Sequence, residues 1–394
     1  MSATRRPHAH PVCSIIPPHI LKHMARLADP KLKKLAERAL ASLAASERLR
    51  GARAAVGGIA PLAMTPVGVK QRTIYDGGKL STLPGTVVRR EGEGPDTDAA
   101  VNEAYEGLGA TYDFFFKVYH RNSLDDRGMA LDATVHHRRN FNNAFWNGRQ
   151  MVFGDGDQEI FQRFTICLDI IAHELTHGIT QYEAGLEYEG QSGALNESFS
   201  DVFGSLVKQY AKGQTAGQAD WLIGAGLWEQ GVKGTALRSM KDPGTAYDDP
   251  RLGKDPQPAH MDHYDDTEED NGGVHINSGI PNRAFYLTAI QFGGYAWQKA
   301  GRIWYLALKD LLSTASDFKD AANVTTNVAG SELGAEAAKI VRDAWKQVGV
   351  QPATLSVARA HIEEKDVAYS SGSKRGTARP AAARARRRQQ PPAH

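Results

Sequence analysis

The chain has 394 residues, and its shares of apolar residues (41%) and charged residues (23%) are ordinary for a globular protein. This composition excludes a fibrous or fully disordered chain, and only two cysteines, Cys13 and Cys167, exclude a disulfide framework. No apolar run is long enough to span a membrane. The net charge of +2 conceals two basic ends, because residues 1–51 hold 10 Lys and Arg against 3 Asp and Glu, and residues 371–394 hold 7 against none. The body between them therefore carries a net charge of −12.

Residues 1–57 are predicted to form a helical segment and a linker. Their basic start leads into no apolar stretch typical of a secretory signal peptide, because the short apolar run ends at Pro17 and Pro18. The small residues over 51–58 indicate a linker open to proteolysis, and we place a domain boundary there. A helical cap on a globular core is favoured over a membrane-surface helix, since a thin apolar face is formed by Leu32, Leu35, Ala39, Leu40 and Leu43.

The body is predicted to have two halves of different structure. Residues 58–178 are rich in strand signals, with one long helix over 96–119 that Asp96 opens. Residues 179–369 are mainly helical, and they include a polar surface loop over 248–270. The fold class is therefore α+β. The expected strands span 72–75, 85–89, 133–138, 142–147 and 150–153, and the expected late helices span 276–293, 296–313, 318–329 and 334–348.

The clearest functional pattern is His-Glu-Leu-Thr-His at 173–177, inside a buried helix predicted over 164–181. Residues i and i+4 share one face of a helix, so His173 and His177 can meet the same metal ion. Zinc binds neutral imidazole nitrogens and keeps one position open for water in catalytic sites. Glu174 is placed to take a proton from that water. Ordinary helical residues are the alternative explanation for so short a pattern.

A third metal ligand is expected downstream, because a catalytic zinc takes three protein ligands. Glu197 lies at the start of a helix predicted over 196–210, and Asp201 lies one turn later on the same face. Asp201 is placed to accept a hydrogen bond from a ligand histidine. For Glu197 alone, a first-turn carboxylate that complements the helix dipole is the alternative. Two polar pairs on apolar helix faces favour the metal site, because buried charges are costly unless they are paired.

The glycine-containing turn over 270–279 places His275 near the start of the next helix. The carboxylate of Asp270, upstream, can hold that histidine in its protonated form. A protonated histidine can stabilise an oxyanion. A helix-capping turn explains this segment equally well when it is considered by itself.

Four segments together resemble the thermolysin family of zinc metallopeptidases, namely NNAFW at 142–146, HELTH at 173–177, GALNESFSD at 193–201 and DNGGVHINSG at 270–279. The resemblance is co-linear over roughly residues 70–350. It implies a thermolysin-like two-domain fold with the zinc cleft between the β-rich and helical halves. It also implies one catalytic zinc ion bound by His173, His177 and Glu197, with Glu174 as general base and Asp201 behind a ligand histidine.

The same resemblance assigns roles to further residues. Tyr188 and His275 correspond to the residues that stabilise the transition state, with Asp270 supporting the histidine, and Arg238 corresponds to the arginine that binds the substrate carbonyl. The edge strand that hydrogen-bonds substrate backbone falls at 143–144, on Asn143 and Ala144. A pocket for a bulky apolar residue after the cut is expected, with core packing as the alternative, from Phe161, Phe164, Ile170, Ile223, Leu227 and Leu237.

The N-terminal segment resembles the short propeptide of protealysin-like enzymes through Ile16-Pro-Pro-His-Ile-Leu21 and the helical residues that follow. It implies a zymogen in which residues 1 to about 51–57 block the cleft, with Pro17, Pro18 and Leu21 among the inhibiting residues. The basic segment and the acidic body are expected to attract each other, and less strongly in salt. The Cys13 thiolate is suited to the open zinc position, although an idle cysteine is the favoured alternative.

One departure from the family concerns calcium. Thermolysin binds paired calcium ions beside the active site through several carboxylates, whereas here only Asp169 and Asp220 match, with Lys208, Leu222 and Ala225 at other positions. Calcium needs about six to eight oxygen ligands, so this set makes a calcium site doubtful. We expect the Lys208 ammonium to replace calcium as the counter-charge of the two carboxylates.

Residues 370–394 are predicted to be a disordered basic tail, because they are rich in Ser, Gly, Ala, Pro and Arg and lack an apolar pattern. The arginines over 384–388 are suited to phosphate neutralisation. No aromatic side chains are interleaved with them to stack bases. A solvated tail is therefore favoured over a nucleic-acid site.

The predicted activity is zinc-dependent endopeptidase cleavage of proteins before bulky hydrophobic residues, by an enzyme made as a self-inhibited zymogen. The expected partners are protein and peptide substrates and the chain's own propeptide, in a monomer without a membrane span. The alternatives are a non-catalytic binding protein, which would not need Glu174, and a dedicated processor of one partner. Synthesis in the cytoplasm is expected from the lack of a signal peptide, and extracellular action from the family resemblance.

Overall fold

The computed structural model describes residues 13–55 and 65–353, and for 49–55 it describes the backbone alone. The chain divides into two units, Met1–Ala353 and Thr354–His394, and all described residues belong to the first unit. The predicted basic tail over 370–394 lies outside the described residues. Within the described ranges, every helix is too short or too polar to cross a membrane.

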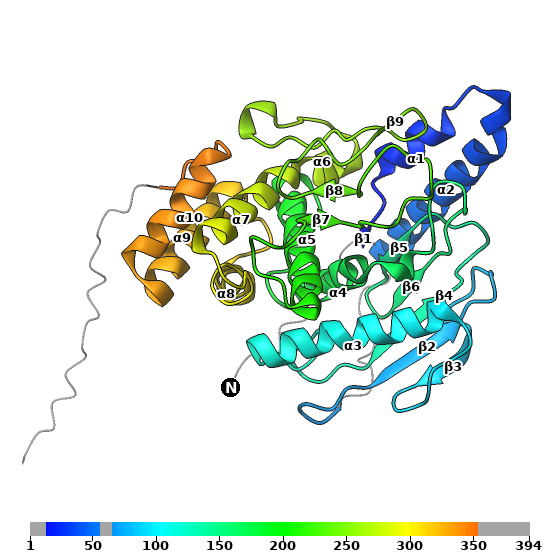
Figure 1. Ribbon diagram of the computed structural model, residues 1–394, viewed down its shortest axis with the longest axis horizontal. Coiled ribbons are helices and arrows are strands. Elements are labelled where there is room, and N and C mark those ends of the chain that lie inside the picture. Colours follow the sequence, from blue (N-terminus) through cyan, green and yellow to red (C-terminus); the bar gives the residue numbers. More distant parts are fainter. Residues whose placement is uncertain (1–12, 56–64, 354–394) are drawn as a thin grey trace, which may run out of the picture. The chain divides into compact units, whose positions relative to one another are not determined.

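A six-stranded mixed sheet forms the β-rich half, with strand order β1-β5-β6-β4-β2-β3 (Figure 1). The β2–β4 and β4–β6 pairs are parallel, and the other pairs are antiparallel. The sequence did not predict β1, Cys13–Ser14, which adds the N-terminal segment to the edge of the sheet beside β5. The predicted strands are present as β2 Arg72–Asp76, β3 Thr86–Arg90, β4 Leu131–Val135, β5 Ala144–Trp146 and β6 Met151–Phe153.

The helix α3, Ala99–Tyr119, packs against this sheet. Its cap is Asp98, whose carboxylate accepts a hydrogen bond from the Ala100 backbone N–H at 2.7 Å, so the helix begins after the predicted Asp96. The other oxygen of Asp98 lies 2.9 Å from His136 Nε2, and His136 Nδ1 lies 2.7 Å from Asp155. This group of three joins the start of α3 to the ends of β4 and β6.

The remaining part of the described chain is mainly helical, which confirms the α+β class. Two long helices, α4 over Leu168–Tyr182 and α5 over Gly190–Lys212, pack against each other at the centre (Figure 1). The later helices are α6 Asp270–Asn277, α7 Gly279–Phe292, α8 Ala300–Leu306, α9 Phe318–Leu333 and α10 Ala335–Gln347. Short elements complete it: β7 Leu222–Ile223, β8 Arg238–Ser239, β9 Asp248–Asp249, β10 Gly253–Lys254, the 3-10 turns Pro30–Leu32, Phe164–Ile166 and Met261–His263, and the π-helix Ala307–Leu311.

Several predicted boundaries differ from the structure. α5 begins at Gly190 instead of residue 196, and Gly193 in its first turn packs so closely that an added Cβ would lie 2.4 Å from Val274. The glycine that this contact requires weakens the helical signal in the sequence. The predicted helix over 276–293 is divided at Ser278, and the predicted helix from 164 starts as a 3-10 turn because Cys167 is extended.

The N-terminal segment forms two helices that lie beside the β-rich half (Figure 1). They are α1, Pro18–Ala25, and α2, Lys33–Ala55. α2 therefore continues through residues 51–55, where the sequence predicted a linker, because the alanines and arginine around Gly51 are strong helix formers. Most buried apolar residues of this segment join the main core cluster, as a helical cap should, including Leu35, Ala39 and Leu43 of α2. Leu40, which was expected on the same face, is exposed instead.

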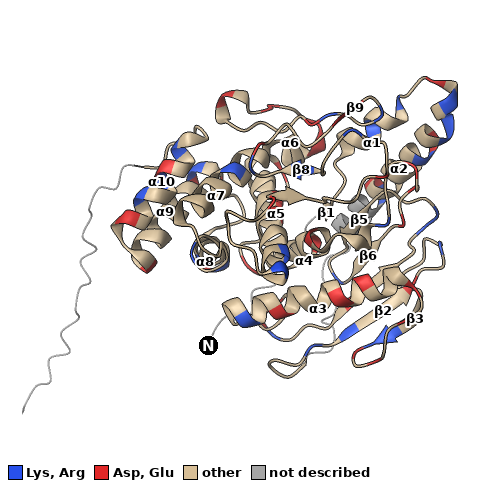
Figure 2. Cartoon of the chain, in the orientation of Figure 1, with Lys and Arg blue, Asp and Glu red and all other residues tan. Residues whose placement is uncertain are grey.

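The contact between the N-terminal segment and the body mixes attraction with repulsion. Ion pairs join Lys22 to Glu269 at 3.0 Å and Arg38 to Glu159 at 3.3 Å. Basic side chains are also present on the described part of α2, together with acidic ones (Figure 2). The predicted attraction between the segment and the body thus has specific partners, although both ion pairs are partly exposed.

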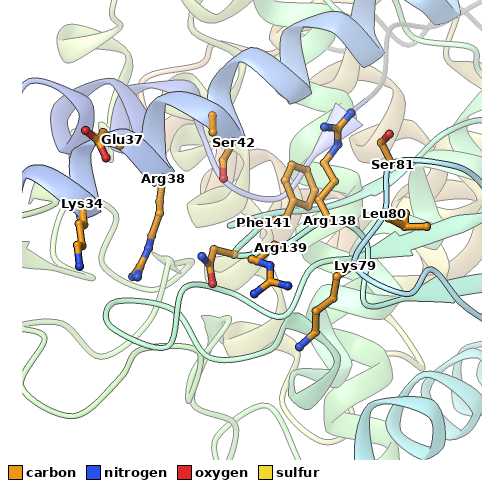
Figure 3. A pocket seen from close by; sticks show the side chains of 12 residues that line it. Lys34, Glu37, Arg38, Ser42, Lys79, Leu80, Ser81, Arg138, Arg139 and Phe141 are labelled. Carbon is orange, nitrogen blue, oxygen red and sulfur yellow. The ribbon is translucent and has the colours of Figure 1, made fainter.

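Between α2 and the body lies a cavity of about 680 Å³ whose charged lining residues are mostly basic (Figure 3). Lys34 and Arg38 project into it from α2, and Lys79 and Arg139 come from the loops after β2 and β4. Glu37 is the single acid among the described residues that line it. Like charges therefore face each other in this cavity. The opposite net charges of the N-terminal segment and the body do not predict this local repulsion. The other lining residues are Ala41, Ser42, Leu80, Ser81, Arg138, Asn140 and Phe141.

Lys79→Glu should raise the melting temperature of the full chain at low ionic strength, because the new carboxylate faces Lys34 and Arg38. Exposed pairs of this kind contribute about 0.5 kcal/mol, and the gain should disappear in about 1 M NaCl. The matched control is Lys241→Glu, at an exposed lysine outside the cavity. Equal effects of both variants would contradict a local repulsion at the cavity.

The His136 group should make stability depend on pH. The hydrogen bond and charge of Asp155, and then the charge of Asp98, raise the pKa of His136 to about 9 against a partial opposing effect of burial. The protonated His136 stabilises the fold fully at pH values below 6.5, the pKa of the unfolded chain. This stabilisation is lost as the pH rises through 9, the pKa in the fold. Because the His136 side chain keeps 18% of its surface exposed, solvent screens part of this effect, and we expect a loss of about 1–2 kcal/mol across this window.

This loss can be measured by urea unfolding at pH 6 and pH 9.5. His136→Asn keeps a polar side chain without a titrating group, so its unfolding free energy should change less across the same window. An unchanged pH dependence in that variant would assign the effect to other groups.

Candidate active site

Two histidines on α4 form the first part of the site. His173 and His177 are separated by one turn, and their Nε2 atoms lie 3.1 Å apart in the buried interior. Leu175 and Ile171 on neighbouring faces pack into the core, which fixes the helix and thereby the direction of both rings. The structure thus brings the two predicted imidazoles together at one point.

Glu197 reaches the same point from α5. Its Oε2 atom lies 3.5 Å from His173 Nε2, and its Oε1 atom lies 3.4 Å from His177 Nε2. Oε2 is buried and has no hydrogen-bond partner among the described residues. Donor atoms that share one tetrahedral zinc ion at 2.0–2.2 Å lie about 3.4 Å from each other. The spacing and the donor types therefore fit a zinc ion.

The outer nitrogens of both rings have acceptors that fix their tautomers. His173 Nδ1 donates to Asp201 Oδ1 at 2.8 Å, as predicted. His177 Nδ1 donates to Asn196 Oδ1 at 2.8 Å, and Ser200 Oγ lies 3.1 Å away. With Nδ1 protonated, Nε2 keeps its lone pair for a metal. The sequence analysis missed Asn196 and Ser200, although both lie on α5 within three residues of Glu197.

Asp201 also receives hydrogen bonds from Arg238 and Asn282. Arg238 donates from Nε and from a terminal nitrogen at 2.8 Å each, and Asn282 Nδ2 donates at 2.8 Å. Burial alone would raise the pKa of Asp201, but the Arg238 charge and the His173 hydrogen bond lower it to about 2. Asn282 was not predicted, because α7 is 81 residues away along the chain.

Glu174 lies next to the two histidines and is fully buried. Its Oε2 atom accepts a hydrogen bond from the Trp146 backbone N–H on β5 at 3.0 Å, and its Oε1 atom has no hydrogen-bond partner among the described residues. Burial raises the pKa of Glu174 to about 8. Because one oxygen is held by the edge strand, the other points to a defined place in the site.

Tyr188, His275 and Asp270 lie together beside Glu197. The Tyr188 hydroxyl donates to Glu197 Oε1 and lies 3.3 Å from His275 Nε2. His275 Nδ1 lies 2.9 Å from Asp270 Oδ1, a contact that left-handed backbone over Asn271–Gly273 makes possible. Burial opposes the charge on His275, but Asp270 and then Glu197 outweigh it, so its pKa is raised. The structure thus brings together the three residues that the resemblance assigned.

Residues 13–16 of the N-terminal segment lie along β5 in extended form. Cys13 pairs with Trp146 and Ser14 with Phe145, antiparallel. The Ile15 N–H donates to the Ala144 carbonyl at 3.1 Å, and the Ile16 N–H donates to Asn143 Oδ1 at 3.0 Å. Arg238 donates to the Ile15 carbonyl at 3.2 Å, and His275 Nε2 to the Ser14 carbonyl at 3.0 Å. Asn143, Ala144, Arg238 and His275 therefore all bind the backbone of this segment.

The predicted pocket residues are all buried, and all of them belong to the main core cluster. Phe161 and Phe164 stack with ring centroids 5.9 Å apart, and Phe161 also packs against Trp228 at 5.2 Å. Ile170 and Leu237 both approach Gly224. The residues predicted for inhibition are buried too. Pro17 is the residue before α1, Pro18 is its first residue, and Leu21 lies within it.

Two family models match the sequence, and together they include all of these site residues except 13–21. The thermolysin metallopeptidase catalytic domain matches residues 69–181, and the thermolysin metallopeptidase alpha-helical domain matches residues 184–350. The chain belongs to the thermolysin family. It is a zinc-dependent metalloendopeptidase by class, as the resemblance implied.

Similar proteins cover most of the chain. An extracellular metalloprotease of Pectobacterium carotovorum subsp. carotovorum is 53% identical over 347 residues, which are 87% of this chain and 98% of the relative. A thermolysin of Alicyclobacillus acidocaldarius subsp. acidocaldarius is 40% identical over 70% of this chain and 50% of its own. The solved precursor of protealysin from Serratia proteamaculans has a TM-score of 0.79 and 51% identity, covering 86% of this chain and 99% of its own. Similarity to a precursor supports a zymogen.

Lys208 lies between the two carboxylates beside α4, as the replacement of calcium by an ammonium would require. Lys208 Nζ donates to Asp169 Oδ2 at 2.9 Å, to Asp220 Oδ1 at 2.8 Å and to the Leu222 carbonyl at 2.7 Å. Burial opposes the charge on Lys208, but the two carboxylates raise its pKa. One ammonium therefore satisfies the two carboxylates that the sequence analysis aligned with calcium ligands.

Calcium at several millimolar should leave the melting temperature unchanged, because the Lys208 ammonium already neutralises these carboxylates. Lys208→Met should destabilise the chain by about 3 kcal/mol, since it leaves the buried Asp169 without a counter-charge. Lys212→Met, at an exposed lysine one turn further along α5, is the matched control and should change little. A clear rise in melting temperature of the unmodified chain with calcium would refute this assignment.

Proposed function

We propose that the chain is a self-inhibited zymogen of an endopeptidase that cleaves before bulky hydrophobic residues. The observation that carries this proposal is the position of residues 13–16. They run along β5 as an extended backbone, and the Cys13 side chain lies beside His177 and Glu197. Residues 1–57 act as the propeptide in this proposal.

His173, His177 and Glu197 would hold the metal, each through one atom in the cluster described above. A zinc ion bound there would supply Lewis-acid activation of a water molecule and of the scissile carbonyl. Asp201 and Asn196 keep the two rings in the tautomer that leaves Nε2 available.

Glu174 moves the proton. Its Oε1 atom faces the site while Oε2 is held by Trp146, so the carboxylate can take a proton from the attacking water. It can then deliver the proton to the leaving amine, as general acid–base catalysis requires. Tyr188 and His275 donate hydrogen bonds to the oxygen that becomes negative, and Asp270 holds His275 in its charged form.

The backbone contacts of residues 13–16 support an extended substrate that lies along β5. Asn143 and Ala144 bind successive backbone groups of the segment, and Arg238 binds the Ile15 carbonyl. Addition of an extended strand to a sheet edge binds main-chain atoms of any sequence. Selectivity must therefore come from side-chain pockets, and we assign the preference for a bulky apolar residue to Ile170 and Leu237, which both border Gly224.

We also propose that the mature enzyme acts outside the cell. The relatives include proteins named as extracellular metalloproteases, from Pectobacterium and from Serratia marcescens. A broad extracellular protease and a processor of one partner share this site chemistry, and a survey of cleaved peptides separates them.

Glu174→Ala should reduce hydrolysis of a denatured protein by at least about 1,000-fold, because general acid–base catalysis contributes about 10²–10⁴. The variant should still bind one zinc ion per chain, measured by elemental analysis, since Glu174 is not a ligand in this proposal. The full-length unmodified chain should shorten near residues 51–58, and a zinc chelator should prevent this.

The control is Glu187→Ala, at an exposed glutamate that follows α4. It should keep activity and self-processing. Substantial hydrolysis by Glu174→Ala would refute the base assignment. An unmodified chain that showed no chelator-sensitive cleavage would refute the enzyme proposal and favour a binding protein.

A further inference from the structure

We propose that the Cys13 thiolate is a fourth ligand of the zinc ion in the zymogen, and that this bond holds the propeptide in the cleft. The proposal rests on the proposed function, because it needs a zinc ion at His173, His177 and Glu197. It assigns a regulatory metal–sulfur bond to a residue whose role the sequence left open.

The position of the sulfur is the first argument. Ligand atoms of Cys13, His177 and Glu197 all lie within 4.8 Å of one another, and all three residues are buried. Glu197 also has a buried oxygen, Oε2, with no hydrogen-bond partner among the described residues. The thiol therefore lies close enough to two of the three predicted zinc ligands to join them on one ion.

The second argument is that the backbone determines which residue supplies this fourth group. Residues 14–16 are fixed by His275, Arg238, Ala144 and Asn143. Successive side chains of a strand point to opposite faces, so this register sends Cys13 toward the metal ligands, where it packs with Tyr188 and Val274. A shift by one residue would turn the sulfur away.

The third argument is charge. A thiolate buried beside Glu197 would be costly without a cation. With Zn²⁺ bound, the two negative ligands balance the two positive charges of the ion, while both imidazoles stay neutral. On binding, the S–H bond breaks, the zinc–sulfur bond forms and the proton leaves to solvent. The water that the reaction needs is then excluded until the bond is broken.

The other cysteine shows what an idle buried thiol looks like in this chain. Cys167 Sγ donates to the Ala225 carbonyl at 3.6 Å, and burial raises its pKa well above the usual value. It lies before α4 and belongs to the apolar core cluster. Since both thiols are buried to a similar extent, Cys167 is a matched control for Cys13.

The direct test is zinc X-ray absorption on the full-length Glu174→Ala chain, which cannot process itself. We expect one sulfur at about 2.3 Å together with nitrogen and oxygen ligands at about 2.0–2.2 Å. Cys13→Ser in this background should lose the sulfur and keep one zinc ion per chain, whereas Cys167→Ser should keep the sulfur. Cobalt in place of zinc should show a sulfur-to-metal charge-transfer band with the same dependence on the variants.

The outcomes separate this proposal from the proposed function. Stoichiometric zinc with only nitrogen and oxygen ligands in the Cys13-containing chain would overturn the thiolate proposal alone. A chain that binds no zinc at this site would overturn both. Sulfur that persists in Cys13→Ser and disappears in Cys167→Ser would also overturn it.

A second measurement does not depend on spectroscopy. In the chain with Glu174 intact, the time before the N-terminal segment is cleaved off should fall at least several-fold in Cys13→Ser and in Cys13→Ala. Cys167→Ser should leave this time unchanged. Circular dichroism and melting curves confirm that each variant is folded before it is compared. An unchanged delay in both folded Cys13 variants would show that the thiol does not hold the propeptide.

Discussion

The Asp201 carboxylate joins four elements at one buried point, and the rest of the site depends on it. It accepts hydrogen bonds from His173 on α4, from Arg238 on β8 and from Asn282 on α7, while its own backbone belongs to α5. Arg238 is buried as deeply and would be an uncompensated charge without this partner. The same guanidinium binds the Ile15 carbonyl. A single carboxylate therefore orients a predicted metal ligand and the group that anchors an extended peptide.

The inhibitory segment uses the binding groups of the cleft in chain order. Residue 16 bonds to Asn143, residue 15 to Ala144 and Arg238, residue 14 to His275, and Cys13 lies at the metal ligands. Because the same groups are proposed to bind substrate, the segment occupies the place that the proposed function gives to a bound peptide. The helices α1 and α2 add apolar burial that a short peptide substrate lacks, and this explains how a weak sequence-independent contact becomes a stable block.

Local patterns in the sequence were sufficient to predict which candidate ligands lie together, but not the residues that support them. His173 and His177 follow from helical periodicity, and Glu197 with Asp201 repeats the same spacing. Asn282 and the β1–β5 pairing depend on contacts 81 and more than 100 residues apart, which no local pattern encodes. The early start of α5 was missed because Gly193 serves a close contact at the expense of helix propensity. Likewise, the net charges predicted attraction between the N-terminal segment and the body. The basic cavity beside α2 instead depends on which individual side chains lie next to each other in the fold.

The strand β1 has a consequence for the chain before any substrate is present. β5 is the edge of the sheet once residues 13–14 are removed, and an exposed edge whose task is to bind any extended backbone can also pair with another unfolded or nascent copy. Here a strand of the same polypeptide pairs with the β5 edge. Because this pairing is intramolecular, it is favoured at any protein concentration. By covering this edge, residues 13–14 should therefore also limit the aggregation of newly made molecules until the segment is removed.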